Sequence, residues 1–534
     1  MHLTNHDLLQ LDRDTLSRLD EEALRRLSER LLDDLKEARD RLNQDSQNSS
    51  RPPSSDSPYG RSRRESSVNE PADDEAVGEG SGPGETLPAE TSPQAREAAP
   101  GASDPSRSDG HTPHSLPLAR APGRQPGAPG QGRHQSLAVT ATLTHRPGEC
   151  ACCGQPLGEA APGHAYGGYD EVDLLPADPV APGLVLTVTR HLPFEVICGC
   201  GHRTRYRFPR AEVPDEWQGA GVDRQQLLGP RLAALVVLLS LRYRLSRTKL
   251  RELLRELTGL ELSIGLIDHT LRQSAGQVAP VEAALLQAVE QSPLLHVDET
   301  SWQEGALSLW FWVFCGVDAV VYWIGTRAKE MFVNALPDGF SGLLMSDGYS
   351  VYRHYENRLR CWAHLLRKAR GLAEATCRLT QEAGGALLVL MGQLIQTVQA
   401  VSCNTGLDDL ARRQTPEVKR LKALCERHQD SSSAKLGAFC REMLKDWAVI
   451  VRPLYDPGLP LTNNAAERQL RHWVVARKIS FGTRSEHGSR ALALLASIID
   501  TCRLRQASAW DYLAEAIRAG RSGMPMPALP TVGG

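Results

Sequence analysis

The chain has 534 residues, 41% of them hydrophobic, and a formal net charge of −3. This is enough for two or more globular units with cores of their own, while the net charge by itself gives no indication of a nucleic-acid partner. The longest apolar run, Leu232–Leu241, is about half of the ~18–20 residues that cross a bilayer, and the N-terminus is acidic and amphipathic, unlike a signal peptide. We therefore expect a cytoplasmic protein with no membrane segment.

Residues 1–45 have the pattern of an amphipathic helix. Apolar residues recur at spacings of three and four, and Asp20 can cap the helix. They are Leu24, Leu27, Leu31, Leu35, Ala38 and Leu42. The pattern is typical of a short coiled coil, so we expect self-association, with packing onto the same chain as the alternative. Residues 46–137 are rich in Ser, Pro, Gly, Asp and Arg and cannot bury enough apolar surface to offset their ordering entropy, which predicts a disordered linker.

Residues 138–215 form a small unit bracketed by cysteines. The alternation in LVLTVTRHLPFEVIC predicts a strand. Five of the 12 cysteines lie between Cys150 and Cys200, and the other seven are scattered. In a chain without a secretory signal, clustered cysteines indicate a metal site and scattered cysteines indicate reduced thiols.

Residues 222–291 have the pattern of three successive helices. Gly259 suits the end of the middle helix, and Ser263 can cap the next one. This outline resembles a helix-turn-helix, with six basic residues crowded into its first half. We expect DNA contact, and the alternative is a helical bundle with a solvated basic face. The basic residues are Arg242, Arg244, Arg247, Lys249, Arg251 and Arg255.

From residue 292 the pattern changes to apolar, β-branched and aromatic runs that predict strands: PLLHVDETSW, LWFWVFCGVDAVVYWIG and SGLLMSDGYSVY. The segment from about 356 to 455 is predicted to be helical again, and two or three helices follow up to residue 519. Residues 520–534 are expected to be a flexible tail.

Three acidic residues stand at predicted strand or helix ends. Asp298 follows the run LLHV, Asp347 follows GLLMS, and Glu467 lies in the first turn of a helix that Asn463 or Asn464 can cap. A carboxylate at the end of a buried strand needs a positive partner, and oxygen-only ligands favour Mg²⁺ or Mn²⁺ over zinc. Two such ions support in-line attack at phosphorus. The alternative is that strand-end aspartates only cap turns.

The surroundings of Glu467 are strongly basic. The segment from Glu467 to Arg505 holds eight basic and three acidic residues, a balance of +5 in a slightly acidic chain. A cationic strip beside a metal site fits a polyanionic substrate, and the alternative is a solvated helix face.

Several segments together resemble the insertion sequence 66 family of transposases. They are NSSRPPSSDSP, HVDETSW, LMSDGYSVY, CWAHLLRKAR and LTNNAAERQLRHWVVARKISFGTRSEHGSRALALLASIIDTCRL. The resemblance implies a multidomain α/β protein with a ribonuclease-H-like catalytic domain at 292–519 and a helical insertion between the second aspartate and the glutamate. It also implies that Asp298, Asp347 and Glu467 are the catalytic triad. It further assigns DNA or phosphate contact to Arg468, Arg471, Arg477 and Lys478.

The cysteine cluster resembles the zinc-binding domain of that family. Cys150 and Cys153 form a C-x₂-C knuckle in which Gly154 permits the tight turn, and Cys198 and Cys200 form the second pair. Four thiolates suit structural Zn²⁺. The C-x-C spacing departs from the expected C-x₂-C, so His202 is an alternative fourth ligand, and Cys152 has no assigned role.

Cys361 and His364 in CWAH have the i, i+3 spacing of a metal-binding pair on a helix. Two ligands are weak evidence, so we favour a packed helix start beside the active site.

The sequence thus predicts a bacterial, nucleoid-associated transposase. It would cut and transfer DNA strands at terminal inverted repeats with Mg²⁺ or Mn²⁺, and a dimer or larger assembly would hold the two ends. The alternatives are a catalytically inactive DNA-binding derivative and a nuclease with other substrates. Accessory proteins of the same element are further candidate partners.

Overall fold

The structure is a computed structural model that describes residues 19–42, 137–176, 180, 183–208, 227–336, 340–400 and 407–532. The linker expected at 46–137 lies outside these residues, apart from residue 137. Helix α3 runs Glu21–Leu42, and the Asp20 side chain caps it by accepting a hydrogen bond of 2.7 Å from the Ala23 amide, as predicted. Leu35 on α3 is 67% exposed, so part of its apolar stripe faces solvent.

Five strands form a small β unit around one long central strand, β4 (Leu186–Ile197). Strand β1 pairs with β4 in parallel, whereas β2, β3 and β5 pair with it in antiparallel orientation. Val172 and Val188 of this unit share a buried cluster with Leu232 and Leu250 of the helices that follow. The four partner strands are β1 (Ala141–His145), β2 (Gly163–Ala165), β3 (Tyr169–Leu174) and β5 (Arg203–Arg205).

Four helices come next. Helix α5 is capped by Ser246 before its first turn and by Gly259 after its last, and the φ of 70° at Gly259 is the left-handed conformation that glycine adopts without strain. Ser263 caps the following helix by accepting a hydrogen bond from the Leu266 amide. Both positions confirm the prediction from sequence, and α7 is an additional helix. The bounds are α4 (Pro230–Leu241), α5 (Arg247–Thr258), α6 (Ile264–Val278) and α7 (Val281–Glu290).

The second sheet has five strands in the order β10-β9-β6-β7-β8. Strands β6, β7 and β8 form an antiparallel meander, whereas β9 is parallel to β6 and β10 is parallel to β9. Their β-branched and aromatic residues suit a pleated, buried surface. The bounds are β6 (Leu294–Glu304), β7 (Leu307–Cys315), β8 (Val320–Gly325), β9 (Leu343–Ser346) and β10 (Arg358–Arg360).

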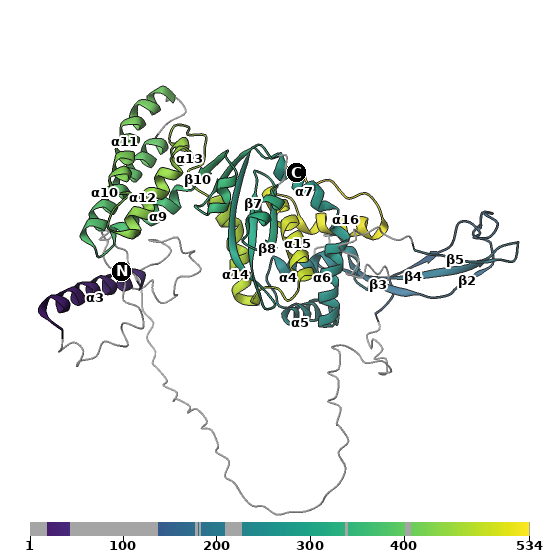
Figure 1. The fold of residues 1–534 in the computed structure, drawn as a ribbon. Coiled ribbons are helices and arrows are strands. Elements are labelled where there is room, and N and C mark those ends of the chain that lie inside the picture. The colour runs from purple at the N-terminus through teal and green to yellow at the C-terminus, as the bar shows by residue number, and fades with distance from the viewer. Residues whose placement is uncertain are drawn as a thin grey trace, which may run out of the picture. The chain divides into compact units, whose positions relative to one another are not determined.

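Helices from the end of the chain cover this sheet (Figure 1). Helix α14 packs on β6 and β7, and α15 lies along the edge strand β8. The hydroxyl oxygens of Ser497 and Thr501 accept hydrogen bonds from the backbone amides of Tyr322 and Val320 at 2.9 and 3.0 Å. Helix α15 therefore satisfies donors that an open sheet edge would expose. The helices are α14 (Asn464–Ser480), α15 (Glu486–Leu504) and α16 (Ala509–Ser522).

The segment after α16 is packed rather than flexible over residues 523–532. Leu529 packs against the main core, and the Arg505 guanidinium donates a hydrogen bond of 2.7 Å to the Pro530 carbonyl. This differs from the flexible tail expected at 520–534, because residues 520–522 complete α16 and Met526 and Leu529 pack on the core, whereas Met524 and Val532 are exposed.

Helices between β10 and α14 form a bundle with its own core (Figure 1). The insertion expected at about 356–455 starts later than predicted, because residues 358–360 form strand β10. Trp362 and Phe439 are among the large buried side chains of the bundle core. The helices are α9 (Trp362–Ala373), α10 (Arg378–Gln399), α11 (Leu407–His428), α12 (Ala434–Lys445) and α13 (Trp447–Val451), followed by the 3₁₀ helix η6 (Arg452–Leu454). Helix α8 (Lys329–Ala335) and the 3₁₀ helix η5 (Ser350–His354) lie outside the bundle.

Candidate active site

Asp298 and Asp347 belong to neighbouring parallel strands of the five-stranded sheet. Asp298 lies inside β6, which continues to Glu304, so it does not end a strand as predicted. Asp347 directly follows β9, as predicted. The two strands pair with His296 opposite Met345, and the same register continued by two residues sets Asp298 opposite Asp347. Because paired strands are about 4.8 Å apart, the sheet brings together two carboxylates that are distant in sequence.

Both aspartates are fixed by backbone hydrogen bonds. Asp298 Oδ1 accepts from the Glu299 amide at 2.9 Å, and Asp347 Oδ1 accepts from the Tyr349 amide at 2.8 Å. Burial raises the pKa of Asp298 well above its ordinary value, and the negative charges of Glu299, Asp347 and Glu467 raise it further. A cation at this position would relieve that repulsion.

Glu467 lies in the first turn of α14, within electrostatic reach of Asp298. Its Oε1 accepts a hydrogen bond of 3.2 Å from Arg367 and lies 3.7 Å from His364 Nδ1. Within the part of the chain that the structure describes, two groups hold three or more candidate ligand atoms within 4.8 Å of one another. Glu467 belongs to one of them with Cys361 and His364, and not with the aspartates. The three predicted carboxylates thus share a region without forming one ligand shell.

Asn463 connects the helix of Glu467 to the strand of Asp298. It is the residue before α14, as expected for a cap, but its side chain does not cap the helix. The side chain is fully buried, and its Oδ1 lies 3.0 Å from His296 Nδ1. Its backbone amide donates to Cys361 Sγ at 3.2 Å.

Glu299 is a buried charge that the sequence reasoning missed. Its side chain is 2% exposed, and it accepts hydrogen bonds from Arg327 at 2.6 Å and from the Tyr352 hydroxyl. Burial and the charge of Asp347 raise the pKa of Glu299 to about 7 despite these partners. The adjacent acidic pair in HVDETSW was the available signal, since a second carboxylate in a predicted strand also needs a partner.

The guanidinium of Arg327 is held between two aromatic rings. It lies 4.1 Å from the centroid of Trp310 and 4.0 Å from that of Tyr349. Such stacking with an ion pair to Glu299 fixes a planar cation next to Asp347.

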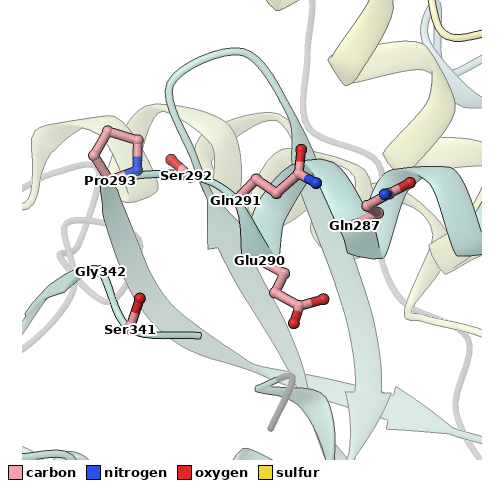
Figure 2. Close-up of a pocket in the computed structure, with 7 residues that line it drawn as sticks. All are labelled: Gln287, Glu290, Gln291, Ser292, Pro293, Ser341 and Gly342. Carbon is pink, nitrogen blue, oxygen red and sulfur yellow. The ribbon is translucent and has the colours of Figure 1, made fainter. Parts of the chain in front are cut away.

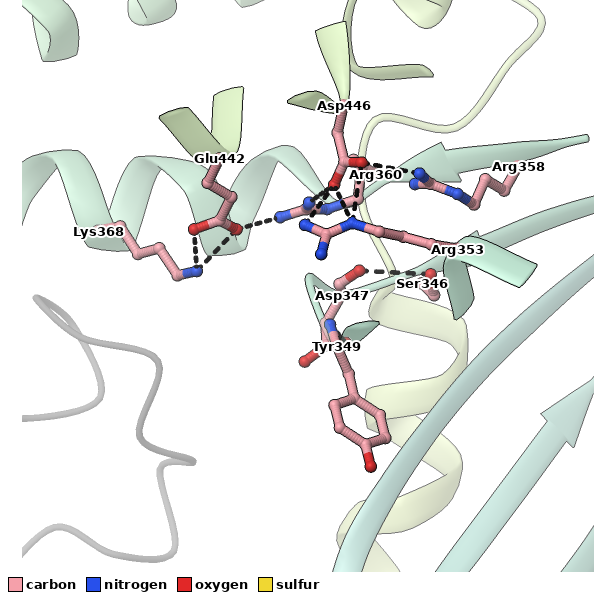
Figure 3. A network of polar contacts seen from close by, with 9 residues as sticks. All are labelled: Ser346, Asp347, Tyr349, Arg353, Arg358, Arg360, Lys368, Glu442 and Asp446. Carbon is pink, nitrogen blue, oxygen red and sulfur yellow. Dashed lines mark hydrogen bonds and ion pairs between the residues drawn. The ribbon is translucent and has the colours of Figure 1, made fainter. Parts of the chain in front are cut away.

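A buried ionic network lies beside Asp347 (Figure 3). Asp446, which follows α12, is 3% exposed and accepts hydrogen bonds from Arg353, Arg358 and Arg360. Burial opposes ionisation of Asp446, but the hydrogen bonds from Arg353 and Arg358 and the charge of Arg360 outweigh it and lower its pKa to about 2.

Glu442 extends the network. It accepts from Arg360 at 2.6 Å and from Lys368 at 2.8 Å (Figure 3). The four cations therefore face two carboxylates, which leaves an excess of positive charge next to Asp347. The network also ties the helical insertion, through α12, to strand β10.

The four basic residues predicted to contact DNA differ in their exposure to solvent. Arg468, Arg471 and Lys478 are exposed on α14. Arg477 is half-buried, and its guanidinium donates a hydrogen bond of 2.6 Å to the Ser301 hydroxyl, so it ties α14 to β6.

Four cysteines of the β unit form the other candidate metal group. Cys150 Sγ and Cys200 Sγ lie 3.7 Å apart, and Cys153 Sγ and Cys198 Sγ lie 3.6 Å apart. Zinc–sulfur bonds of about 2.3 Å place the sulfurs of a regular tetrahedron about 3.8 Å apart, so the thiols fit zinc. Gly154 has a φ of 69°, as the tight turn requires, and His202 is not in the group formed by the described residues. The group is Cys150, Cys153, Cys198 and Cys200.

A cavity of about 470 Å³ opens where β6 and β9 begin (Figure 2). The candidate site residues named above do not line it. It is lined by Gln287, Glu290, Gln291, Ser292, Pro293, Ser341 and Gly342.

Comparison with protein families gives two matches. The family described as Transposase IS66 family matches residues 225–491, which include the four helices, the five-stranded sheet, the insertion and α14. A family of unknown function, DUF6444, matches residues 8–79.

Curated relatives of the chain include uncharacterized proteins of Sinorhizobium fredii. One, y4qI, is 23% identical over 301 residues, which are 50% of this chain and 55% of the relative. Another, y4jO, is 29% identical over 190 residues, which are 35% of this chain and 56% of the relative. The chain thus spans about half the length of these relatives.

Proposed function

Because the chain belongs to the IS66 family of transposases, we propose that it cleaves DNA at the ends of an insertion sequence and joins the freed strands to target DNA. The observation that supports the proposal is the parallel pairing of β6 with β9 up to His296 and Met345, together with the effect of the Asp347 charge on the pKa of Asp298. A sheet in which an antiparallel meander continues into parallel strands supports a ribonuclease-H-like core.

Asp298, Asp347 and Glu467 are the proposed ligands of Mg²⁺ or Mn²⁺, since these ions prefer oxygen donors. When bound, such ions activate a water or a 3′-hydroxyl and stabilise the leaving oxygen. Asp298 and Asp347 bring two carboxylates to neighbouring strands of the sheet. Glu467 must exchange its contact with Arg367 for the ions, because its carboxylate is grouped with α9 in this structure.

The exposed cations Arg468, Arg471 and Lys478 are the proposed phosphate contacts. They lie on the same helix as Glu467, so DNA bound along α14 passes the carboxylates. Arg477 is proposed to support the site by holding α14 on β6. Recognition of the element ends is assigned to the helices at 230–290 and to the β unit with its zinc.

No helix in the described part of the chain is long and apolar enough to span a membrane. Joining requires two element ends in one complex, so a dimer or larger assembly is part of the proposal. Accessory proteins of the element are candidate additional partners.

The test is strand cleavage and joining by the full chain on linear DNA that carries the ends of its own element, with Mg²⁺ or Mn²⁺. Asp298→Asn should reduce the rate by about 10³-fold or more, because a metal contributes several kcal/mol of transition-state stabilisation. The matched control is Asp318→Asn, an aspartate in the turn between β7 and β8 that pairs with Arg505 at 2.9 Å.

The outcomes separate the alternatives. End-specific cleavage that Asp298→Asn abolishes and Asp318→Asn retains supports the proposal. Binding of the ends without any cleavage identifies a DNA-binding derivative. Equal cleavage of random DNA or of an RNA–DNA hybrid identifies a nuclease of another kind.

A further inference from the structure

Cys361, His364 and Glu467 form a cluster of candidate metal ligands separate from the four cysteines. Their ligand atoms lie within 4.8 Å of one another, and His364 Nδ1 is 3.7 Å from Glu467 Oε1. In a tetrahedral zinc site with bonds of about 2.0–2.3 Å, neighbouring ligand atoms are about 3.3–3.8 Å apart. The cluster is therefore close to the spacing that a bound zinc ion would impose.

Two helix starts create this cluster. Cys361 is the N-cap of α9, and His364 follows it by three residues, so both side chains lie over the first turn. Glu467 lies in the first turn of α14. The Asn463 amide donates to Cys361 Sγ at 3.2 Å, whereas burial raises the pKa of the Cys361 thiol, so a metal that binds there displaces the thiol proton.

The ring of His364 indicates that the cluster has room for a bound cation. Its side chain is 13% exposed, and its Nδ1 is buried with no hydrogen-bond partner among the residues that the structure describes. Buried polar atoms are normally hydrogen-bonded, so a nitrogen that faces a carboxylate beyond hydrogen-bond distance suits a cation between them.

The chemical nature of the three ligand atoms favours zinc over magnesium. A thiolate, an imidazole and a carboxylate suit zinc, whereas Mg²⁺ prefers oxygen ligands. Three protein ligands leave a fourth position for water. Arg367 remains a hydrogen-bond donor to Glu467, which a ligating carboxylate can accept beside its metal bond.

We propose that Cys361, His364 and Glu467 bind Zn²⁺ and thereby hold Glu467 apart from Asp298 and Asp347. The ion would be regulatory: it withdraws the glutamate from the proposed Mg²⁺ ligands, so zinc inhibits the reaction. This consequence rests on the proposed function, whereas the binding site itself does not.

Metal binding is tested on the metal-free full chain by Co²⁺ titration, with bound metal counted by elemental analysis. Wild type should bind two equivalents that show thiolate-to-Co²⁺ charge-transfer absorption, an intense one from four thiolates and a weak one from a single thiolate. Co²⁺ at Asp298 and Asp347 has no thiolate ligand and does not add to this absorption. His364→Gln and Cys361→Ser should each lose only the second equivalent. The control Cys425→Ser, another buried cysteine, should retain both.

A single thiolate-bound equivalent in wild type, or a second thiolate-bound equivalent that persists in both variants, overturns the proposal. If Cys361→Ser does not fold, the comparison of wild type with His364→Gln still tests metal binding, because the His364 side chain is not fully buried and its replacement should leave the fold intact.

The regulatory step is tested by adding Zn²⁺ to the Mg²⁺-dependent cleavage assay. The Zn²⁺ concentration for half inhibition should be at least about 10-fold higher for His364→Gln than for wild type. An equal concentration for the two proteins overturns the regulatory role. Absence of Mg²⁺-dependent cleavage by wild type instead refutes the proposed function and leaves the Co²⁺ result standing.

Discussion

The side-chain amide of Asn463 donates a hydrogen bond of 2.8 Å to the carbonyl oxygen of Val297, the residue before Asp298. The carbonyl oxygen of Asn463 accepts from the amide of Glu467 at 3.2 Å. One buried residue thus links the strand of the first aspartate to the helix of the glutamate. Burial lowers the pKa of His296, which favours the neutral imidazole that can donate to the Asn463 side-chain oxygen.

Asn463→Ala should lower the free energy of unfolding by about 1–3 kcal/mol, because it leaves the Val297 carbonyl and His296 buried without their partner. Urea denaturation of both proteins measures this. The neighbouring Asn464 is exposed, and Asn464→Ala should stay within about 0.5 kcal/mol of wild type. Equal stability of the two variants would contradict the role assigned to Asn463.

Asp446→Asn should destabilise the protein far more than loss of a surface ion pair. It removes the carboxylate shared by Arg353, Arg358 and Arg360 and leaves their charges buried, which costs about 3–5 kcal/mol. Asp409→Asn on α11 is the control, since its partner Arg413 is 65% exposed and the pair is worth less than about 1 kcal/mol. Similar midpoints of denaturation for the two variants would show that the network does not support the fold.

The contribution of Asp446 should also depend on pH. Its pKa in the folded protein, about 2, is below the ordinary value of 3.8, so its stabilising effect is complete above about pH 4 and is lost as the pH falls towards 2. The difference in unfolding free energy between wild type and Asp446→Asn should therefore shrink across that window. A constant difference from pH 6 to pH 2 would contradict the assigned pKa.

Most elements of the fold could be predicted from local patterns. The caps at Asp20 and Ser263, the stop at Gly259 and the aromatic strands all depend on residues close in sequence, which is where such reasoning is strong. Strand β10 falls inside the segment predicted to be helical, because a strand of three residues, Arg358–Arg360, is too short and too polar to show a strand pattern.

The candidate site could be predicted only in part. The prediction that both aspartates end strands holds for Asp347 but not for Asp298, since β6 continues to Glu304. The sequence also does not indicate that β6 and β9 pair side by side. It also gave Cys361 and His364 as a weak pair, because the third member, Glu467, lies about a hundred residues later and joins them only through the packing of α14 on α9. Long-range contacts of this kind leave no periodic signal.

Removal of zinc from the cysteine group should unfold the small β unit and leave the five-stranded sheet intact. Cys198→Ser should lose one bound zinc and expose residues 137–208 to proteolysis, because structural zinc contributes folding free energy directly. Cys152→Ser is the matched control: this thiol is exposed and is not in the group. Equal zinc content and equal protease resistance of the two variants would refute a structural zinc at these thiols.

Glu299 should give a pH dependence of the opposite sign to that of Asp446. Its pKa of about 7 in the folded protein exceeds the ordinary 4.5, so the folded state holds the proton more tightly than the unfolded state does. Stability contributed by the protonated form is therefore present below about pH 4.5 and is lost as the pH rises towards and through 7, by up to about 1.4 kcal/mol for each pKa unit.

Glu299→Gln keeps a neutral group at this position, so wild type should lose stability relative to this variant between pH 4.5 and 8. Denaturation of both proteins across that range measures the slope. A relative gain by wild type would mean that Arg327 and the Tyr352 hydroxyl stabilise the ionised carboxylate more than burial and the charge of Asp347 oppose it.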